Sequence, residues 1–109
     1  MKRGDLVTVA ANLPYTGKPR PAVIIQSDAF PLASVTLCLI TSEETEPVDL
    51  RIRLDPDHLN GLQRASWIMI DKILTVPREQ IGQRFGQLVE AQVALLDQAL
   101  AVFLDLRGA

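Results

Sequence analysis

Apolar residues occur in short runs along most of the chain, and turn-forming residues separate one run from the next. Runs of this length and composition predict β-strands, here at residues 5–10, 22–25, 34–40, 48–54, 64–70, 73–76 and 83–88. The second and third runs are largely apolar, which is typical of strands that are buried on both faces. The fourth alternates apolar and polar residues and therefore predicts a strand with one face in solvent.

The last part of the chain has a different period. Val89, Val93, Leu96, Leu100 and Phe103 recur at intervals of three and four residues, which predicts an amphipathic helix of about 17 residues. Several short strands followed by one helix predict a mainly β (α+β) fold, with the helix packed on a compact antiparallel barrel. A chain of 109 residues is expected to form one domain over its whole length.

The stretch around Arg20 combines charge with stiffness. Pro19 and Pro21 fix their own backbone angles and bias the preceding residues toward extended conformations. Arg20 is therefore held at the mouth of the second predicted strand, where its guanidinium can be aimed at a ligand. An arginine in this position can also do no more than pair with a nearby carboxylate. Taken alone, this stretch favours the second interpretation.

Composition and charge narrow the functional classes. The chain is 48% hydrophobic and 22% charged, as is usual for globular proteins, and no stretch is long enough to span a bilayer. One cysteine, Cys38, excludes an internal disulfide and fits a reducing cytoplasm. The net charge of −2 argues against a general nucleic-acid binder. Residues 1–20, however, hold four basic side chains against one acidic, whereas residues 43–57 hold six acidic against two basic.

The only histidine, His58, lies in the segment 55–61, whose composition predicts a turn rather than a metal site. A single histidine also excludes a two-histidine ribonuclease mechanism within one chain. We therefore expect neither a metal nor a cofactor, and we expect no signal peptide.

Three motifs follow one another in the first part of the chain: Gly-Asp-Leu-Val at 4–7, Arg-Pro-Ala-Val at 20–23 and Ile-Thr-Ser at 40–42. In this order and spacing they resemble the MazF/PemK family of toxin endoribonucleases, within the CcdB/MazF superfamily. The resemblance implies an SH3-like antiparallel β-barrel with a C-terminal helix, working as a homodimer. It also implies the toxin of a type II toxin–antitoxin system that a cognate antitoxin neutralises.

The implied activity is that of an mRNA interferase: metal-independent, sequence-specific cleavage of single-stranded RNA that inhibits translation and growth. Its products are a 2′,3′-cyclic phosphate and a 5′-hydroxyl. The resemblance assigns catalytic roles to Arg20, Thr41 and Asp71. A guanidinium offers planar donors to phosphate but hardly deprotonates, so we expect Arg20 to stabilise charge in the transition state.

Thr41 is expected to orient the scissile phosphate or the 2′-hydroxyl, although a threonine here is also a common strand-end cap. Asp71 is expected either to act as the base or to hold Arg20 in place. RNA contacts are assigned to Lys18, Ser42 and Tyr15, the last of which either stacks on a base or folds back over the barrel edge.

Two arginines, Arg51 and Arg53, share the polar face of the predicted strand 48–54. We interpret them as a solvated face, with an RNA track as the alternative. The chain departs from the family pattern near Asp71: Lys72 replaces a glutamine, Leu74 replaces an arginine, and Met69 stands where PemK-like members have an arginine. These departures leave the identity of the base and the RNA specificity open.

Two other functions remain at this stage. A CcdB-like gyrase poison shares the superfamily fold, but its action depends on a C-terminal tryptophan and this chain ends Leu-Arg-Gly-Ala. A catalytically inactive MazF-like binding module is the other, and the presence of both Arg20 and Thr41 weighs against it.

Overall fold

A six-stranded antiparallel sheet runs through the part of the chain that the computed structural model describes, residues 1–10 and 18–108. The strands are β1 (Asp5–Val9), β2 (Arg20–Ile24), β3 (Ser34–Thr41), β4 (Arg51–Leu54), β5 (Ser66–Pro77) and β6 (Ile81–Gln87). Two short 3-10 helices, η1 (Val48–Leu50) and η2 (Arg78–Gln80), precede β4 and β6, and the helix α1 (Glu90–Phe103) ends the fold.

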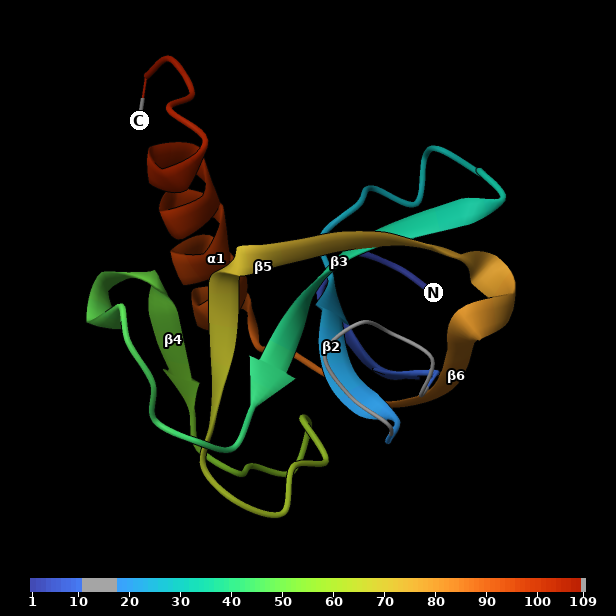
Figure 1. Cartoon of the computed structure of the whole chain (residues 1–109), viewed down its shortest axis with the longest axis horizontal. Coiled ribbons are helices and arrows are strands. Elements are labelled where there is room, and N and C mark those ends of the chain that lie inside the picture. Colours follow the sequence, from blue (N-terminus) through green and yellow to red (C-terminus); the bar gives the residue numbers. More distant parts are fainter. Residues whose placement is uncertain (11–17, 109) are drawn as a thin grey trace.

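The sheet is strongly curved but open. Its strand order is β4-β5-β3-β2-β1-β6, and among the described strands no pairing joins β4 to β6. β5 turns sharply partway along its length (Figure 1). The expected mainly β architecture, an antiparallel barrel-like sheet with a C-terminal helix, is confirmed.

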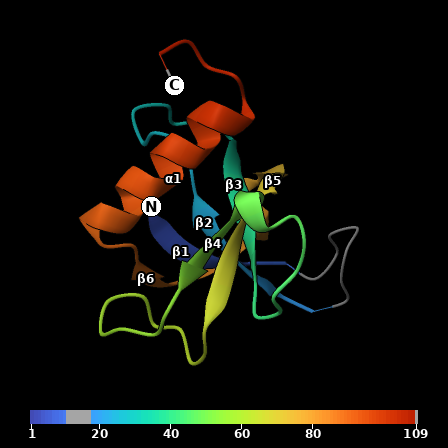
Figure 2. The same ribbon diagram turned by 90° about the vertical axis from the view of Figure 1, so that its left-hand side faces the viewer.

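The core has two layers because successive residues of each strand point to opposite faces of the sheet. On one face, Leu96 and Leu100 of α1 pack with Leu6, Ile40 and Ile68, and Figure 2 shows α1 lying across the sheet. The other face carries a second buried cluster: Val7, Val9, Ala22, Ile24, Val35, Leu37, Leu39 and Val76. The prediction that the second and third strands are buried on both faces is therefore confirmed.

The predicted strand 48–54 is shorter in the structure. The stretch 48–54 was expected to be extended throughout, but residues 48–50 form η1 and only Arg51–Leu54 is a strand. Val48 is 66% exposed, so the apolar alternation of this stretch overstated its burial. The cause is local, since Leu50 donates its N–H to the Pro47 carbonyl and closes a tight turn.

The predicted strands 64–70 and 73–76 are one continuous strand, β5, that contains a bulge. β3 pairs Cys38 with Ile73 and Ile40 with Ile68, so residues 69–72 of β5 lie opposite Leu39 alone. Extra residues in one strand of a pair bend it and re-aim its side chains. The polar pair 71–72 thus lies inside a strand, at its bend, instead of between two strands.

The predicted C-terminal helix is confirmed at a length of 14 residues. It begins after Val89, whose N–H donates to the Gln92 side chain at 2.9 Å. None of the helices in the described residues is long and apolar enough to cross a membrane.

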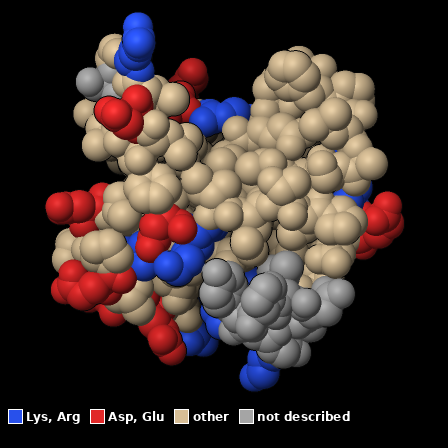
Figure 3. All heavy atoms as spheres, turned by 45° about the horizontal axis from the view of Figure 1, so that its top comes forward, with Lys and Arg blue, Asp and Glu red and all other residues tan. Residues whose placement is uncertain are grey.

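Charged side chains gather on the left of the face drawn in Figure 3, and uncharged residues fill its middle and upper right.

Candidate active site

Strands β2 and β3 bring Arg20 and Thr41 together. Arg20 begins β2 and Thr41 ends β3. The strands pair Ala22 with Leu39, and the same antiparallel register, continued by two residues, sets Arg20 opposite Thr41. Side chains of directly opposed residues project from the same face of a sheet. These two predicted site residues are therefore neighbours on the face that α1 leaves open.

A pocket of about 210 Å³ lies at this point. It is lined by Arg20, Leu39, Ile40, Thr41, Glu43, Met69 and Lys72. Its polar groups are two cations, one carboxylate and one hydroxyl, set among apolar side chains. Two cations beside a hydroxyl form a suitable environment for a phosphate.

Thr41 is nearly buried, with 7% of the residue exposed. Its Oγ1 accepts a hydrogen bond from the Glu43 backbone N–H at 3.1 Å, so the strand-end cap considered as an alternative is present. A hydroxyl that accepts one bond still has its own O–H to donate. Capping and orienting a substrate oxygen are therefore compatible in Thr41.

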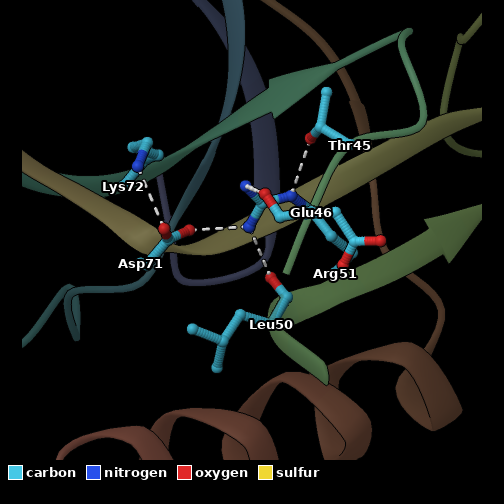
Figure 4. Close-up of polar contacts among 6 residues, drawn as sticks. All are labelled: Thr45, Glu46, Leu50, Arg51, Asp71 and Lys72. Carbon is cyan, nitrogen blue, oxygen red and sulfur yellow. Dashed lines mark hydrogen bonds and ion pairs between the residues drawn. The ribbon is translucent and has the colours of Figure 1, made fainter. Parts of the chain in front are cut away.

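Asp71 does not line this pocket and binds two other cations. Its Oδ1 accepts a hydrogen bond from Arg51 Nη1 at 2.6 Å, and its Oδ2 accepts one from Lys72 Nζ at 2.9 Å. Figure 4 shows Asp71 between the two side chains. Within the described residues, the contacts of Asp71 run to Arg51 and Lys72 instead of Arg20.

These contacts set the protonation of Asp71. Partial burial raises the pKa of its carboxyl group, but the hydrogen bonds from Lys72 and Arg51 and their positive charges outweigh this, so the pKa lies below the ordinary 3.8. A carboxylate with a lowered pKa and both oxygens occupied is a weak proton acceptor.

Arg51 is the residue that the sequence interpretation placed wrongly. Its side chain is only 5% exposed, so it does not belong to a solvated face, whereas Arg53, at 58%, does. Besides binding Asp71, the Arg51 guanidinium donates to Thr45 Oγ1 and to the Glu46 and Leu50 carbonyls, each at 3.0 Å (Figure 4). The guanidinium therefore ties the acidic loop 43–47 and η1 to the bend of β5.

Arg51 lies directly opposite Met69 on β5. A cation is thus supplied to Asp71 from the neighbouring strand. The sequence showed Met69 only as a departure near Asp71, and it is the pairing of β4 with β5 that brings Arg51 to this carboxylate. Lys72 was also missed as a site residue; it lines the pocket and binds Asp71.

The remaining expected site residues are placed as follows. Lys18 and Ser42 are exposed, Lys18 just before β2 and Ser42 just after β3. Tyr15 lies outside the described residues.

Burial raises the pKa of the Cys38 thiol to about 12, so this cysteine is unsuited to nucleophilic chemistry. No group of three or more potential metal-ligating side chains occurs in the described part of the chain.

Comparison with known proteins places the chain among toxins. A family model described as a PemK-like, MazF-like toxin of type II toxin–antitoxin systems matches residues 2–104. A protein of Mycolicibacterium smegmatis named a probable endoribonuclease MazF is 48% identical over 109 residues, which cover 99% of this chain and 100% of that protein.

Solved structures agree on the fold. The Mycobacterium tuberculosis toxin MazF-mt6 has a TM-score of 0.78 at 24% identity, covering 94% of this chain and 97% of that one. A mycobacterial endoribonuclease in complex with its cognate antitoxin has a TM-score of 0.82 at 21% identity, covering 100% of this chain and 99% of that one. At these identities the two likenesses establish the fold alone.

The Arg51–Asp71 contact predicts unequal effects for two arginines on one strand. Arg51→Met should lower the free energy of unfolding by about 3 kcal/mol, the low end for breaking a buried ion pair, because Lys72 still binds the carboxylate. Arg53→Met removes an exposed pair with Asp55 and should cost about 1 kcal/mol or less. Urea unfolding monitored by circular dichroism measures both, and equal costs would contradict a structural role for Arg51.

Repeating the unfolding measurements at acidic pH provides the control for the comparison of wild type with Arg51→Met. Because folding lowers the pKa of Asp71, its contribution to stability is complete above the ordinary value of 3.8 and is lost as the pH falls below that value. The difference between wild type and Arg51→Met should therefore shrink in acid. A difference that does not change with pH would mean that Arg51 acts through its packing alone.

Proposed function

The chain belongs to the PemK-like, MazF-like toxin family of type II toxin–antitoxin systems, and from this premise we propose that it cleaves single-stranded RNA at the Arg20–Thr41 pocket. The family resemblance read from the sequence is confirmed, and the MazF-like endoribonuclease is supported over the gyrase poison. The observation that carries the proposal is that Arg20, Thr41 and Lys72 line one pocket.

In the proposed reaction, the ribose 2′-oxygen attacks the adjacent phosphorus and the bond to the 5′-oxygen breaks. The products are a 2′,3′-cyclic phosphate and a 5′-hydroxyl. Arg20 donates two parallel hydrogen bonds to the non-bridging phosphate oxygens and stabilises the charge that develops on them. Lys72 adds a second positive charge, and Thr41 orients the attacking hydroxyl.

The reaction requires a proton acceptor for the 2′-hydroxyl, and the lowered pKa of Asp71 makes it a poor choice. Glu43 is the carboxylate among the residues that line the pocket. We assign the accepting step to Glu43 and a positioning role to Asp71, which holds Lys72 toward the site. The proton on the departing 5′-oxygen then returns from Glu43 or from water.

The same proposal covers the setting in which the protein works. Cleavage proceeds in the cytoplasm without a metal ion or cofactor, since the two cations take over the charge stabilisation that a metal would supply. The active form is a homodimer. A cognate antitoxin neutralises it; in support, a similar mycobacterial endoribonuclease was solved in complex with its cognate antitoxin.

The test of the reaction is a series of single substitutions. Arg20→Ala should slow RNA cleavage by about 10²–10³-fold, because one preorganised donor to a developing oxyanion contributes that much. Arg20→Lys should rescue little, since an ammonium lacks the bidentate geometry. Thr41→Ala should be milder, and Glu43→Gln should slow cleavage without weakening RNA binding. A labelled RNA pool is assayed with and without EDTA.

Arg64→Ala is the matched control, since Arg64 is exposed and does not line the pocket. Circular dichroism verifies that each variant is folded. A folded Arg20→Ala protein that cuts RNA at the wild-type rate would refute the role of Arg20 in catalysis. Loss of cleavage in EDTA would refute metal independence.

The homodimer proposal rests on the apolar outer edge of α1. Leu95, Val102 and Leu106 are exposed, and Leu95 and Val102 line a groove between α1 and β4. A second copy of the chain would cover this edge. Light scattering at micromolar concentration should give twice the monomer mass, and Val102→Asp should reduce it. A strictly monomeric wild type would contradict the proposal.

We expect an acidic, partly disordered antitoxin segment to cover Arg20 and the residues before it, because the N-terminal region is basic and lies beside apolar strands. Disordered segments can wrap a large surface on binding. Hydrogen exchange should show protection in residues 11–20 when the antitoxin is present; part of this stretch lies outside the described residues. Protection confined to residues 43–47 would contradict this footprint.

A further inference from the structure

The line of side chains that contains Arg20 and Thr41 continues across the sheet beyond the pocket. Thr41 is paired with Trp67 on β5, and Trp67 is paired with Arg53 on β4. Directly paired residues of antiparallel strands share a face. Thr41, Trp67 and Arg53 therefore follow one another on one face, over strands that lie side by side in Figures 1 and 2.

Trp67 is the only tryptophan of the chain. It is half-buried, and the guanidinium carbon of Arg53 lies 5.4 Å from the centroid of its ring. Arg53 itself is mostly exposed and pairs with Asp55 at 3.0 Å. An exposed guanidinium beside an indole is a common platform for an unpaired base, because both groups present flat faces on which bases stack.

A second pocket of about 310 Å³, here called the Trp67 pocket, adjoins this platform. It is lined by Glu44, Thr45, Glu46, Val48, Arg51, Arg53 and Trp67. The loop after β3 connects it to the active-site pocket, since Glu43 lines the first pocket and the next three residues line the second. Neighbouring strands lie about 4.8 Å apart, so a phosphate at Thr41 and the base of an adjoining nucleotide can be held at the same time.

We propose that the Trp67 pocket is a nucleobase subsite that receives one unpaired RNA base next to the scissile phosphate. The inference rests on the proposed endoribonuclease function and extends it to substrate selection. Two arginines and two carboxylates line the pocket. Arg51 is paired with Asp71 and Arg53 with Asp55, whereas Glu44 and Glu46 repel phosphate and accept hydrogen bonds from amino groups. The occupant is therefore a base, not the backbone.

The charge of the pocket also selects among bases. Adenine, cytosine and guanine carry an exocyclic amino group that can donate to a carboxylate, whereas uracil presents carbonyl oxygens in its place. The subsite should prefer bases with an amino group over uracil. Stacking on Trp67 tolerates every base, so Glu44 and Glu46 are the residues that discriminate between bases.

The single tryptophan makes the wild-type protein its own probe. The ligand is a single-stranded oligoribonucleotide whose 2′-hydroxyls are methylated, so that it binds without being cut. Its binding should change the tryptophan emission, because a base stacks on Trp67. An oligonucleotide with the same backbone but abasic sugars should bind more weakly and leave the emission unchanged.

Affinity measurements on variants test the same point without fluorescence from the protein. Trp67→Ala should weaken binding of the labelled, methylated RNA by about 5- to 150-fold, the range for losing one stacked base, and Trp67→Phe should lose less. Phe30→Ala, which removes an exposed aromatic residue outside both pockets, should bind like wild type. Combined Glu44→Gln and Glu46→Gln should reduce the preference for oligo(A) and oligo(C) over oligo(U).

The outcomes separate this inference from the proposed function. If wild type binds and cuts RNA but shows no emission change, and Trp67→Ala binds equally well, the subsite is overturned and the endoribonuclease stands. If wild type neither binds the methylated RNA nor cuts the unmodified one, the proposed function itself fails. Should Trp67→Ala not fold, the wild-type emission and the Trp67→Phe affinity decide the matter.

Discussion

The contact between Arg51 and Asp71 is the constraint on which the geometry of the site depends. A nearly buried guanidinium is tolerated only if its donors are satisfied, and Arg51 meets this condition through Asp71, Thr45, Glu46 and Leu50. These partners come from the bend of β5, the acidic loop and η1. The Arg51 side chain therefore connects the acidic loop and the bend of β5, which form two sides of the Arg20–Thr41 pocket. Asp71 in turn holds Lys72 beside this pocket.

The bulge in β5 makes this contact possible. A regular strand would alternate its side chains strictly between two faces. Residues 69–72 instead lie opposite Leu39 alone, so Asp71 and Lys72, although adjacent in sequence, both take part in the network beside the pocket. Bulges commonly re-aim side chains in this way.

Positive and negative side chains are distributed unequally between the two neighbouring pockets. The pocket at Arg20 and Thr41 offers cations to a phosphate, whereas the neighbouring Trp67 pocket is rimmed by acidic residues and carries an indole beside a guanidinium. A nucleotide has a charged backbone and a flat, polar-edged base, and our proposals assign the first to the Arg20–Thr41 pocket and the second to the Trp67 pocket. The net charge of −2 therefore does not describe the local charge at either pocket.

Much of this protein follows from its sequence, because strand burial, the terminal helix and the rigid segment around Arg20 depend on local composition. Residues 22–24 and 37–40 are buried as their apolar runs predict, and ordered motifs at 4–7, 20–23 and 40–42 were enough to identify the family. The partners of Asp71 were decided only by tertiary structure. Arg51 and Arg53 look alike in sequence, yet one is nearly buried and the other exposed, because only Arg51 lies where the bend of β5 presents a carboxylate.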